Sequence, residues 1–269
     1  MEARMLSQMR TNVELVSMLF MRALRTELEY RGSFILKILG LFTNSVTFLV
    51  IWWIYFAQFE SLNGWTIRET ALMLAVSSAV IGWVLVFLRG LTLLARAISR
   101  GELDYYLCLP VNPLWMQAIA YMEMGGLGDL LFALFVLCFF VNLTISQLLL
   151  FIFLVFCGGI ILASFLILTQ SLAFYFGNFE DSAEQLWWSQ AAFGLYPQSA
   201  YGGLLRVVSM TIFPSFFMIK LPVTIILNPS WHELGLMLGF TALFFSFSLW
   251  VFRSGLRRYE SGNLINVLR

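Results

Sequence analysis

Two acidic residues, Glu123 and Asp129, interrupt a long apolar run over residues 116–141. A carboxylate at membrane depth is energetically costly, which makes it a candidate for moving a proton or binding an ion. Their spacing of six residues puts them on roughly opposite faces of one helix, so a shared site would need a second helix. The alternative is that both lie near the inner end of that helix, where they face the cytoplasm or pair with an arginine.

The sequence lacks the motifs of several other chemistries. It contains no GxxxxGK[ST] phosphate loop, so the chain does not bind ATP by that route. The sole histidine, His232, lies in a predicted turn, and Cys108, Cys138 and Cys157 do not have the spacing of metal ligands. Neither a GxSxG elbow nor an HExxH helix occurs. We expect no catalytic residue, no metal site and no cofactor in this chain, and its net charge of +1 does not indicate a nucleic-acid partner.

The composition is typical of a membrane protein. The chain has 269 residues, of which 60% are hydrophobic and 12% charged, and its mean hydropathy is +0.85. A hydrocarbon core of about 30 Å needs roughly 20 helical residues. We therefore predict an all-α integral membrane protein with six transmembrane helices. The six apolar runs of sufficient length cover residues 34–57, 70–94, 116–141, 147–176, 207–227 and 234–252.

The two ends of the chain are expected on one side of the membrane. Residues 1–32 mix charged and apolar side chains at helical spacing, which predicts an amphipathic elbow helix rather than the alternative, a frayed tail. Residues 33–253 would form the transmembrane domain and residues 254–269 a cytoplasmic tail. Arginine and lysine near span ends are retained in the cytoplasm. With an inner N-terminus nearly all of them fall there, except Arg68 outside and Lys220 within a span, so we expect a multi-pass protein of the inner (cytoplasmic) membrane with both termini cytoplasmic.

The path of residues 177–233 is the hardest to predict. Residues 179–195 have the pattern of an amphipathic helix on the inner surface, anchored by Trp187 and Trp188. The fifth span would follow, kinked or broken by its prolines. The alternative is a broken or re-entrant piece on the outer side, which is tolerated only where protein or a cavity covers the freed backbone groups.

A polar segment, Arg96–Pro110, separates the second and third spans. Its charges keep it at a membrane surface, where another protein can push on it. A span holds it at each end, and Pro110 and Pro113 stop it, so it can transmit a rigid movement. The alternative is a solvated inner loop without a partner.

Three stretches of the chain resemble type 2 ATP-binding-cassette (ABC) exporter permeases. Residues 99–113, SRGELDYYLCLPVNP, are similar to the GxLxxxLxxP connection between the second and third spans of that family. Parts of residues 196–222 and the stretch 255–262, GLRRYESG, fit its bacterial six-span branch, which long carried an uncharacterised transport system label. The three occur in the same order, and the resemblance spans the chain.

The resemblance implies six helices preceded by an elbow helix, with two permeases in each complex. A second copy or a paralogue would be the partner permease, and a pair of separate ABC ATPase subunits would bind ATP and Mg²⁺. In that family the connection after the second span supplies a coupling helix, so residues 95–113 become the coupling segment. Its expected contacts with the ATPase, or its turn residues, are Arg100, Gly101, Glu102, Leu103 and Asp104.

The resemblance also implies a translocation path lined by the first, second and fifth spans. The polar side chains of those three runs are the candidate path residues: Asn44, Ser45, Thr47, Ser77, Ser78, Ser209 and Thr211. They lie among bulky apolar side chains. Such a path suits an amphipathic, drug-like, lipid or glycan-type cargo better than a free ion.

Three functions are consistent with these patterns. The leading one is the permease subunit of an ATP-driven exporter. A rival is a proton-coupled secondary transporter that uses Glu123 or Asp129. The third is a structural scaffold that transports nothing. Membrane lipids are partners of the chain in every case.

Overall fold

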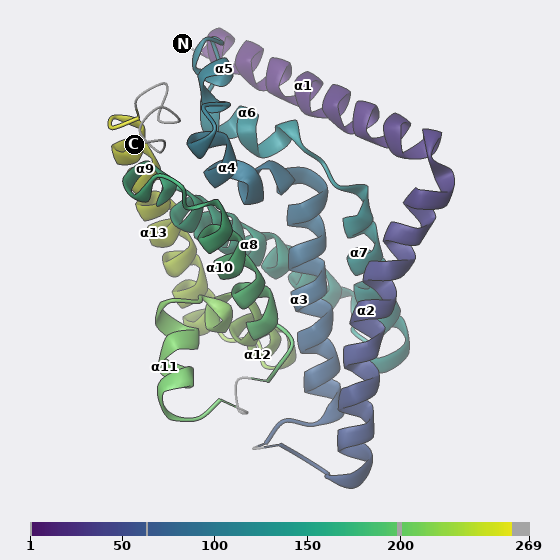
Figure 1. Ribbon diagram of the computed structural model, residues 1–269. Helices are drawn as coiled ribbons and strands as arrows, with labels where there is room; N and C mark the ends of the chain where they lie inside the picture. Colours follow the sequence, from purple (N-terminus) through teal and green to yellow (C-terminus); the bar gives the residue numbers. More distant parts are fainter. Residues whose placement is uncertain (1, 63, 198–200, 260–269) are drawn as a thin grey trace.

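The computed structural model describes residues 2–62, 64–197 and 201–259, and these residues form a bundle of helices (Figure 1). The elements that position the site are, in chain order, α1 (Glu2–Glu29), α2 (Arg31–Gln58), α3 (Ile67–Leu88), η1 (Arg89–Leu93), α4 (Leu94–Ser99), α5 (Leu103–Leu107), α6 (Pro113–Ala120), η2 (Met124–Gly126), α7 (Leu127–Val136), η3 (Leu137–Val141), α8 (Ile145–Gln170), α9 (Ala173–Phe176), α10 (Glu180–Phe193), α11 (Gly203–Thr211), η5 (Phe216–Lys220), α12 (Leu221–Leu227) and α13 (Trp231–Leu256).

The bundle has two distinct ends. Helix α1 lies across one of them, which we call the proximal end, together with α5 and α6 (Figure 1). The distal end is opposite, where residues 59–66 join α2 to α3. Helix α13 ends at the proximal end, so α1 begins and α13 ends on the same side, as an even number of passes requires. Of the predicted tail, 254–269, only the part up to Tyr259 is described; residues 260–269 lie outside the described residues, as do 198–200 of the second stretch of resemblance.

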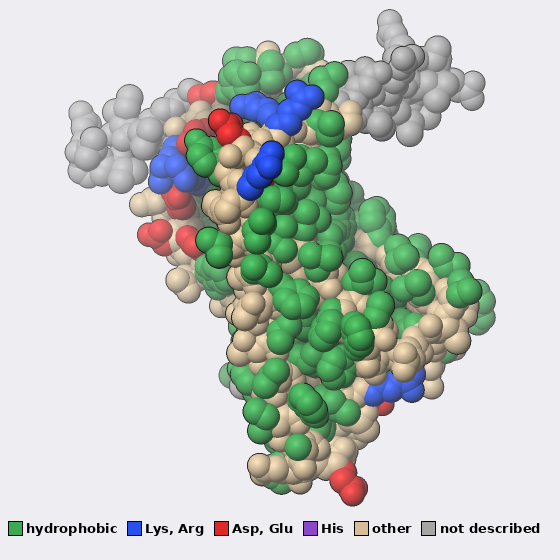
Figure 2. All heavy atoms as spheres, turned by 90° about the vertical axis from the view of Figure 1, so that its right-hand side faces the viewer, with side chains coloured by type: hydrophobic (Ala, Val, Ile, Leu, Met, Phe, Trp, Pro, Cys, Tyr) green, Lys and Arg blue, Asp and Glu red, His purple; other side chains and the backbone are tan. Residues whose placement is uncertain are grey.

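Five helical stretches are long and apolar enough to cross a membrane. They are Arg31–Gln58, Ile67–Ser99, Met124–Val141, Ile145–Phe176 and Trp231–Leu256. Figure 2 shows hydrophobic side chains over the middle of the face that carries α1 and α2, with charged side chains gathered toward the ends. These findings confirm an all-α membrane protein, and four of the predicted spans correspond closely to four of these stretches.

The predicted third span, 116–141, is wrong as a single helix. Helix α6 stays at the proximal end, and residues 121–123 are not helical before the chain enters η2 and α7. The Glu123 backbone N–H donates to the Leu85 carbonyl of α3 at 3.1 Å, which fixes the break. Two adjacent glycines follow, and glycine lowers helix stability by about 1 kcal/mol relative to alanine. The helix therefore restarts closer to α3.

The expectation that residues 179–195 lie on the inner surface is also wrong. Helix α10 begins at the proximal end, where Glu180 is ion-paired to the segment after α3. Its other end packs against Ser77, which lies midway along α3. Just beyond it, the Leu195 carbonyl accepts a hydrogen bond of 3.0 Å from the Trp52 indole of α2. Helix α10 thus runs into the bundle and takes the place of the fifth span.

The predicted fifth span, 207–227, is instead a broken hairpin. Met218 of η5 lies against Gly158, midway along α8. At the end of α12, the Ile226 carbonyl accepts a hydrogen bond of 3.2 Å from the Gln147 side chain, at the distal start of α8. The chain therefore turns back toward the distal end, as the re-entrant alternative predicted. Prolines in the turn and in the first turn of α12 interrupt the helix.

Helix α3 is the centre of the bundle. Almost all of its residues between 70 and 86 are buried, and α2, α7 and α8 all contact it. Its closest approach is to η2, because a Cβ atom on Gly82 would lie 2.8 Å from the Gly126 carbonyl oxygen. The two backbones therefore meet where neither residue has a side chain. This contact positions the residues that follow η2, among them Asp129.

We expect Gly82→Ala to lower the free energy of unfolding by roughly 1–3 kcal/mol, since the added methyl group overpacks a backbone contact. Thermal or SDS unfolding of the purified chain in detergent measures this. The matched control is Gly239→Ala on α13, where an added Cβ meets no atom within 4 Å. Equal stability of the two variants would contradict the close approach of α3 and η2.

Candidate transport cavity and coupling segment

A cavity of about 640 Å³ lies between α2, α3 and α10. These are the first two spans and the helix that takes the place of the fifth. Most of its charged side chains lie toward the proximal end, whereas Asp129 lies deeper, beside Ser45 and Ser78, and apolar side chains complete the wall. The lining residues are Leu41, Asn44, Ser45, Phe48, Ser77, Ser78, Ile81, Leu85, Arg89, Thr92, Leu93, Arg96, Glu123, Asp129, Gln170, Glu180, Glu184, Trp187, Trp188, Ala191, Ala192 and Leu195.

An ion pair between Arg89 and Glu123 forms part of the charged wall. Arg89 Nε and Glu123 Oε2 are 2.8 Å apart. Arg89 is the first residue of η1, where α3 tightens, and Glu123 lies in the break before η2. The Arg89 guanidinium also donates to the Thr92 hydroxyl. About a third of each partner in the ion pair is exposed, so the pair remains accessible from the cavity.

Asp129 is the most deeply buried carboxylate of the cavity, with only 6% of its surface exposed. The Ser45 hydroxyl donates to Asp129 Oδ1 at 3.0 Å, and the Ser78 hydroxyl donates to Ser45 at 3.3 Å. This chain of hydroxyl groups joins α2, α3 and α7. Burial disfavours the charged form of this carboxylate, and the hydrogen bond from Ser45 offsets part of that cost.

The third wall of the cavity is one face of α10. Trp187 is buried and Trp188 is mostly exposed. The Trp188 indole N–H donates to Glu184 Oε1 at 3.3 Å, one helical turn before it. Ala191 and Ala192 follow on the next turn and leave room in the cavity. The face therefore combines two large aromatic rings with carboxylates and small side chains.

The predicted path residues divide into two groups. Asn44, Ser77 and Ser78 line the cavity, together with Ser45. The others lie elsewhere: Thr47 donates to the Thr43 carbonyl one turn back in α2, Thr211 donates to the Val207 carbonyl, and Ser209 is buried in the re-entrant hairpin. The predictions at Ser209 and Thr211 depended on a fifth span at 207–227, which the structure does not have.

Glu123 and Asp129 line the same cavity, in contrast to the opposite faces expected from their spacing. That expectation assumed one continuous helix, and the break at residues 121–123 removes the assumption. The alternative that a carboxylate pairs with an arginine is confirmed for Glu123. Asp129 pairs with Ser45 instead.

Several cavity residues were not among the predicted site residues. Arg89, Arg96, Glu180 and Glu184 are the main ones, together with the two tryptophans of α10. Sequence reasoning placed α10 on the membrane surface, where its polar face would contact water. A polar face that lines an internal cavity has the same periodicity. The one feature of the sequence that could have indicated a cavity here is the number of acidic residues so close to a span.

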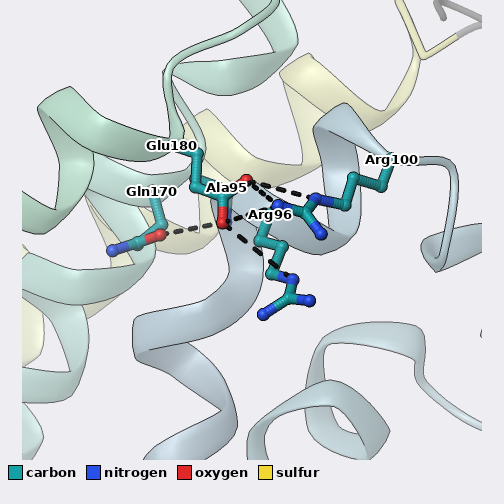
Figure 3. A network of polar contacts seen from close by, with 5 residues as sticks. All are labelled: Ala95, Arg96, Arg100, Gln170 and Glu180. Carbon is teal, nitrogen blue, oxygen red and sulfur yellow. Dashed lines mark hydrogen bonds and ion pairs between the residues drawn. The ribbon is translucent and has the colours of Figure 1, made fainter.

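The predicted coupling segment, residues 95–113, contacts α10 and α8 at the proximal end (Figure 3). Both Arg96 and Arg100 point toward the Glu180 carboxylate, which begins α10, at 3.9 Å and 3.0 Å. The Ala95 backbone N–H donates to the Gln170 side chain at the end of α8, at 2.9 Å. These contacts join the segment to the helix that forms one wall of the cavity.

The five predicted coupling residues occupy different environments. Gly101 has φ +74°, which favours glycine at the turn between α4 and α5. Glu102 is exposed, and Arg100 is exposed but engaged with α10. Leu103 is fully buried and anchors α5. Pro113 does not stop the segment but begins α6, in which the Asn112 side chain caps the first turn.

Asp104 lies beside the hydroxyl group of Tyr259, which follows α13. Burial raises the pKa of the Tyr259 hydroxyl well above its ordinary value, and the neighbouring Asp104 carboxylate raises it further. Asp104 is thus oriented toward the C-terminal end of the bundle. Of the acidic residues in the turn, Glu102 is the one that is free to meet a partner.

A family model described as "ABC-2 family transporter protein" matches residues 42–262. The chain belongs to this family and is a permease of an ABC transporter. Members of the family generally work with ABC ATPase subunits, which supply the energy that a permease lacks. Neither the curated proteins nor the solved structures contain a match. Family membership favours this function over the proton-coupled secondary transporter, and Glu123 is already neutralised by Arg89.

The Arg89–Glu123 contact should be measurable in a double-mutant cycle. Arg89→Gln and Glu123→Gln should show a coupling energy of roughly 0.5–1 kcal/mol, as expected for a partly exposed ion pair. Unfolding in mixed micelles gives the four free energies. The control cycle joins Arg89 to Glu184, which are not ion-paired in the described residues and should couple weakly. Equal coupling in the two cycles would count against the pair.

Proposed function

We propose that this chain is the membrane subunit of an ATP-driven exporter and forms a translocation path for an amphipathic or lipid-like cargo. The observation that supports the proposal best is the cavity between α2, α3 and α10. Its wall combines charged and hydroxyl groups with apolar and aromatic side chains. An amphipathic molecule can place its polar head against the first set and its apolar tail against the second.

In this proposal the proximal end faces the cytoplasm. Most of the arginine and lysine residues of the described chain lie at or near that end, and such residues are retained in the cytoplasm. The first and last described residues would then lie inside the cell, and the bundle would span the inner membrane. A second permease, either another copy or a paralogue, would complete the path.

The separate ATPase subunits would bind ATP and Mg²⁺ and would dock on residues 95–113. When they close, they would push the coupling segment, and the contacts of Arg96 and Arg100 with Glu180 would carry this movement into α10. A shift of α10 changes the width of the cavity it lines. The cavity would thus alternate between two states of exposure, each favoured by a different state of the ATPase.

We expect Glu102→Arg to reduce copurification of the ATPase roughly tenfold or more. The substitution reverses a charge on the proposed docking surface, and docking depends on complementary charges of the two partners. The unfolding temperature of the permease should stay unchanged, since Glu102 is exposed. Quantitative pull-down and ATPase assays in detergent measure both effects.

The matched control for the docking test is Glu60→Arg. Glu60 is equally exposed but lies at the distal end of the bundle. Retention of the ATPase by both variants would contradict docking at the coupling segment. Labelling of a cysteine at position 102 by an impermeant reagent from outside intact cells would contradict the proposed orientation.

We expect Ala192→Trp to lower transport strongly while ATPase binding persists, because the indole ring fills part of the cavity from an exposed position on α10. Transport of a fluorescent amphiphile into inside-out vesicles is the measurement. Gln185→Trp is the control, since Gln185 is exposed on α10 but does not line the cavity. Equal transport by the two variants would argue against this cavity as the path.

A further inference from the structure

We infer that the cavity selects a cargo with a positively charged head, either a protonated amine or a quaternary ammonium, attached to an apolar tail. This inference rests on the proposed function and specifies its substrate class. The lining residues include two arginines and four carboxylates, which leaves a formal charge of −2. The carboxylates are Glu123, Asp129, Glu180 and Glu184.

The pairing of these charges shows where the negative charge remains. Glu123 is neutralised by Arg89, and Glu180 is held by Arg96 and Arg100. No ion pair among the described residues joins Asp129 or Glu184 to an arginine or lysine. These two carboxylates lie on opposite walls of the cavity, Asp129 on α7 and Glu184 on α10. Together they would attract a cation to the space between the walls.

Asp129 has the stronger requirement for a partner. It is almost fully buried, and within the part of the chain that the structure describes it accepts a hydrogen bond from Ser45 alone. An ionised carboxylate can accept about four hydrogen bonds, and burying it without a counter-charge is costly. The Ser45 and Ser78 hydroxyls stabilise the charge only in part. A cationic head in the cavity would supply the missing partner.

Two other buried polar groups point to an occupant. Ser77 and Gln170 line the cavity and are 2% and 1% exposed. The Ser77 hydroxyl and the amide nitrogen of Gln170 have no hydrogen-bond partner among the described residues. Buried polar groups are nearly always paired in a folded protein, and unpaired ones call for a missing ligand or water. Neither group takes part in the ion pairs of the cavity or in the hydrogen bonds that join Ser78, Ser45 and Asp129.

Aromatic side chains on the wall suit the same ligand. Trp187 and Trp188 lie on the cavity face of α10, next to Glu184. Tryptophan is the best aromatic partner for a cation, and aromatic rings recognise quaternary ammonium groups. Phe48 of α2 and Ile81 of α3 add apolar surface for a tail. The cavity therefore offers charge, ring faces and apolar surface in one space.

The test uses the permease in phosphatidylcholine nanodiscs, in a background without its native cysteines and with Ala192→Cys as reporter. Three amphiphiles with the same dodecyl chain are compared: dodecyltrimethylammonium, neutral dodecyl maltoside and dodecyl sulfate. Each is titrated for its ability to protect Cys at position 192 from maleimide. A two-chain lipid with the same trimethylammonium head is a fourth arm, which distinguishes a membrane lipid from a free amphiphile as the source.

We expect the cationic probe to protect the reporter at roughly tenfold or more lower concentration than the neutral probe, because a desolvated charge pair forms only with the cation. Asp129→Asn should remove this preference while keeping the bond from Ser45. Glu184→Gln should weaken the preference for the cationic probe. Because residue 184 is exposed, this variant still tests the inference if Asp129→Asn does not fold. Asp181→Asn, one residue from the cavity wall and exposed, should leave the preference unchanged.

Two different failures can be told apart. If all the amphiphiles protect equally and Asp129→Asn has no effect, selection for a cation is overturned, but the cavity still takes amphiphiles and the proposed path stands. If no probe protects the reporter, while the reporter reacts normally in the folded permease, both the charge preference and the proposed path are overturned.

Discussion

A charged side chain at membrane depth needs a partner or a water-filled space, and this constraint shapes the bundle. Glu123 meets Arg89 only because the third pass breaks and lets the chain approach α3. Asp129 is placed by the contact of η2 with α3, and it receives Ser45 of α2. The same break that accommodates one carboxylate therefore brings the other to the edge of a cavity. The break in the third pass therefore accounts both for the Arg89–Glu123 ion pair and for the position of Asp129 at the cavity.

The parts of the fold that the sequence predicts well are those set by hydrocarbon length. Helices α2, α3, α8 and α13 each follow one long apolar run with few charges. Helix α10 could not be recognised in this way, because its 14 residues have low average hydrophobicity. In the bundle its polar face lines a cavity and its other face packs on α8. Periodicity reports that a face is polar but does not say whether bulk water or an internal space lies against it.

The glycines show a similar limit. Small residues allow a neighbouring helix to approach closely, and Gly126 does so against Gly82. Gly235 and Gly239, spaced four apart on α13, give the same small-residue pattern, but nothing in the described chain lies within 4 Å of a Cβ added there. A glycine pattern indicates where close contact is permitted. Which contacts form depends on the path of the chain, and for Gly126 that path is fixed by the Glu123 backbone bond to α3.

Glu180 connects the cavity to the proposed coupling segment, and the sequence alone did not predict that these two regions are in contact. Its carboxylate holds Arg96 and Arg100 of the coupling segment, and the same residue lines the cavity as the first residue of α10. The contact is between partly exposed groups, so its strength is modest. The buried hydrogen bond from the Ala95 backbone N–H to the Gln170 side chain holds the segment on α8. A push on the proposed coupling segment would then reach α10 through the Glu180 ion pairs, while the bond between Ala95 and Gln170 keeps the start of the segment on α8.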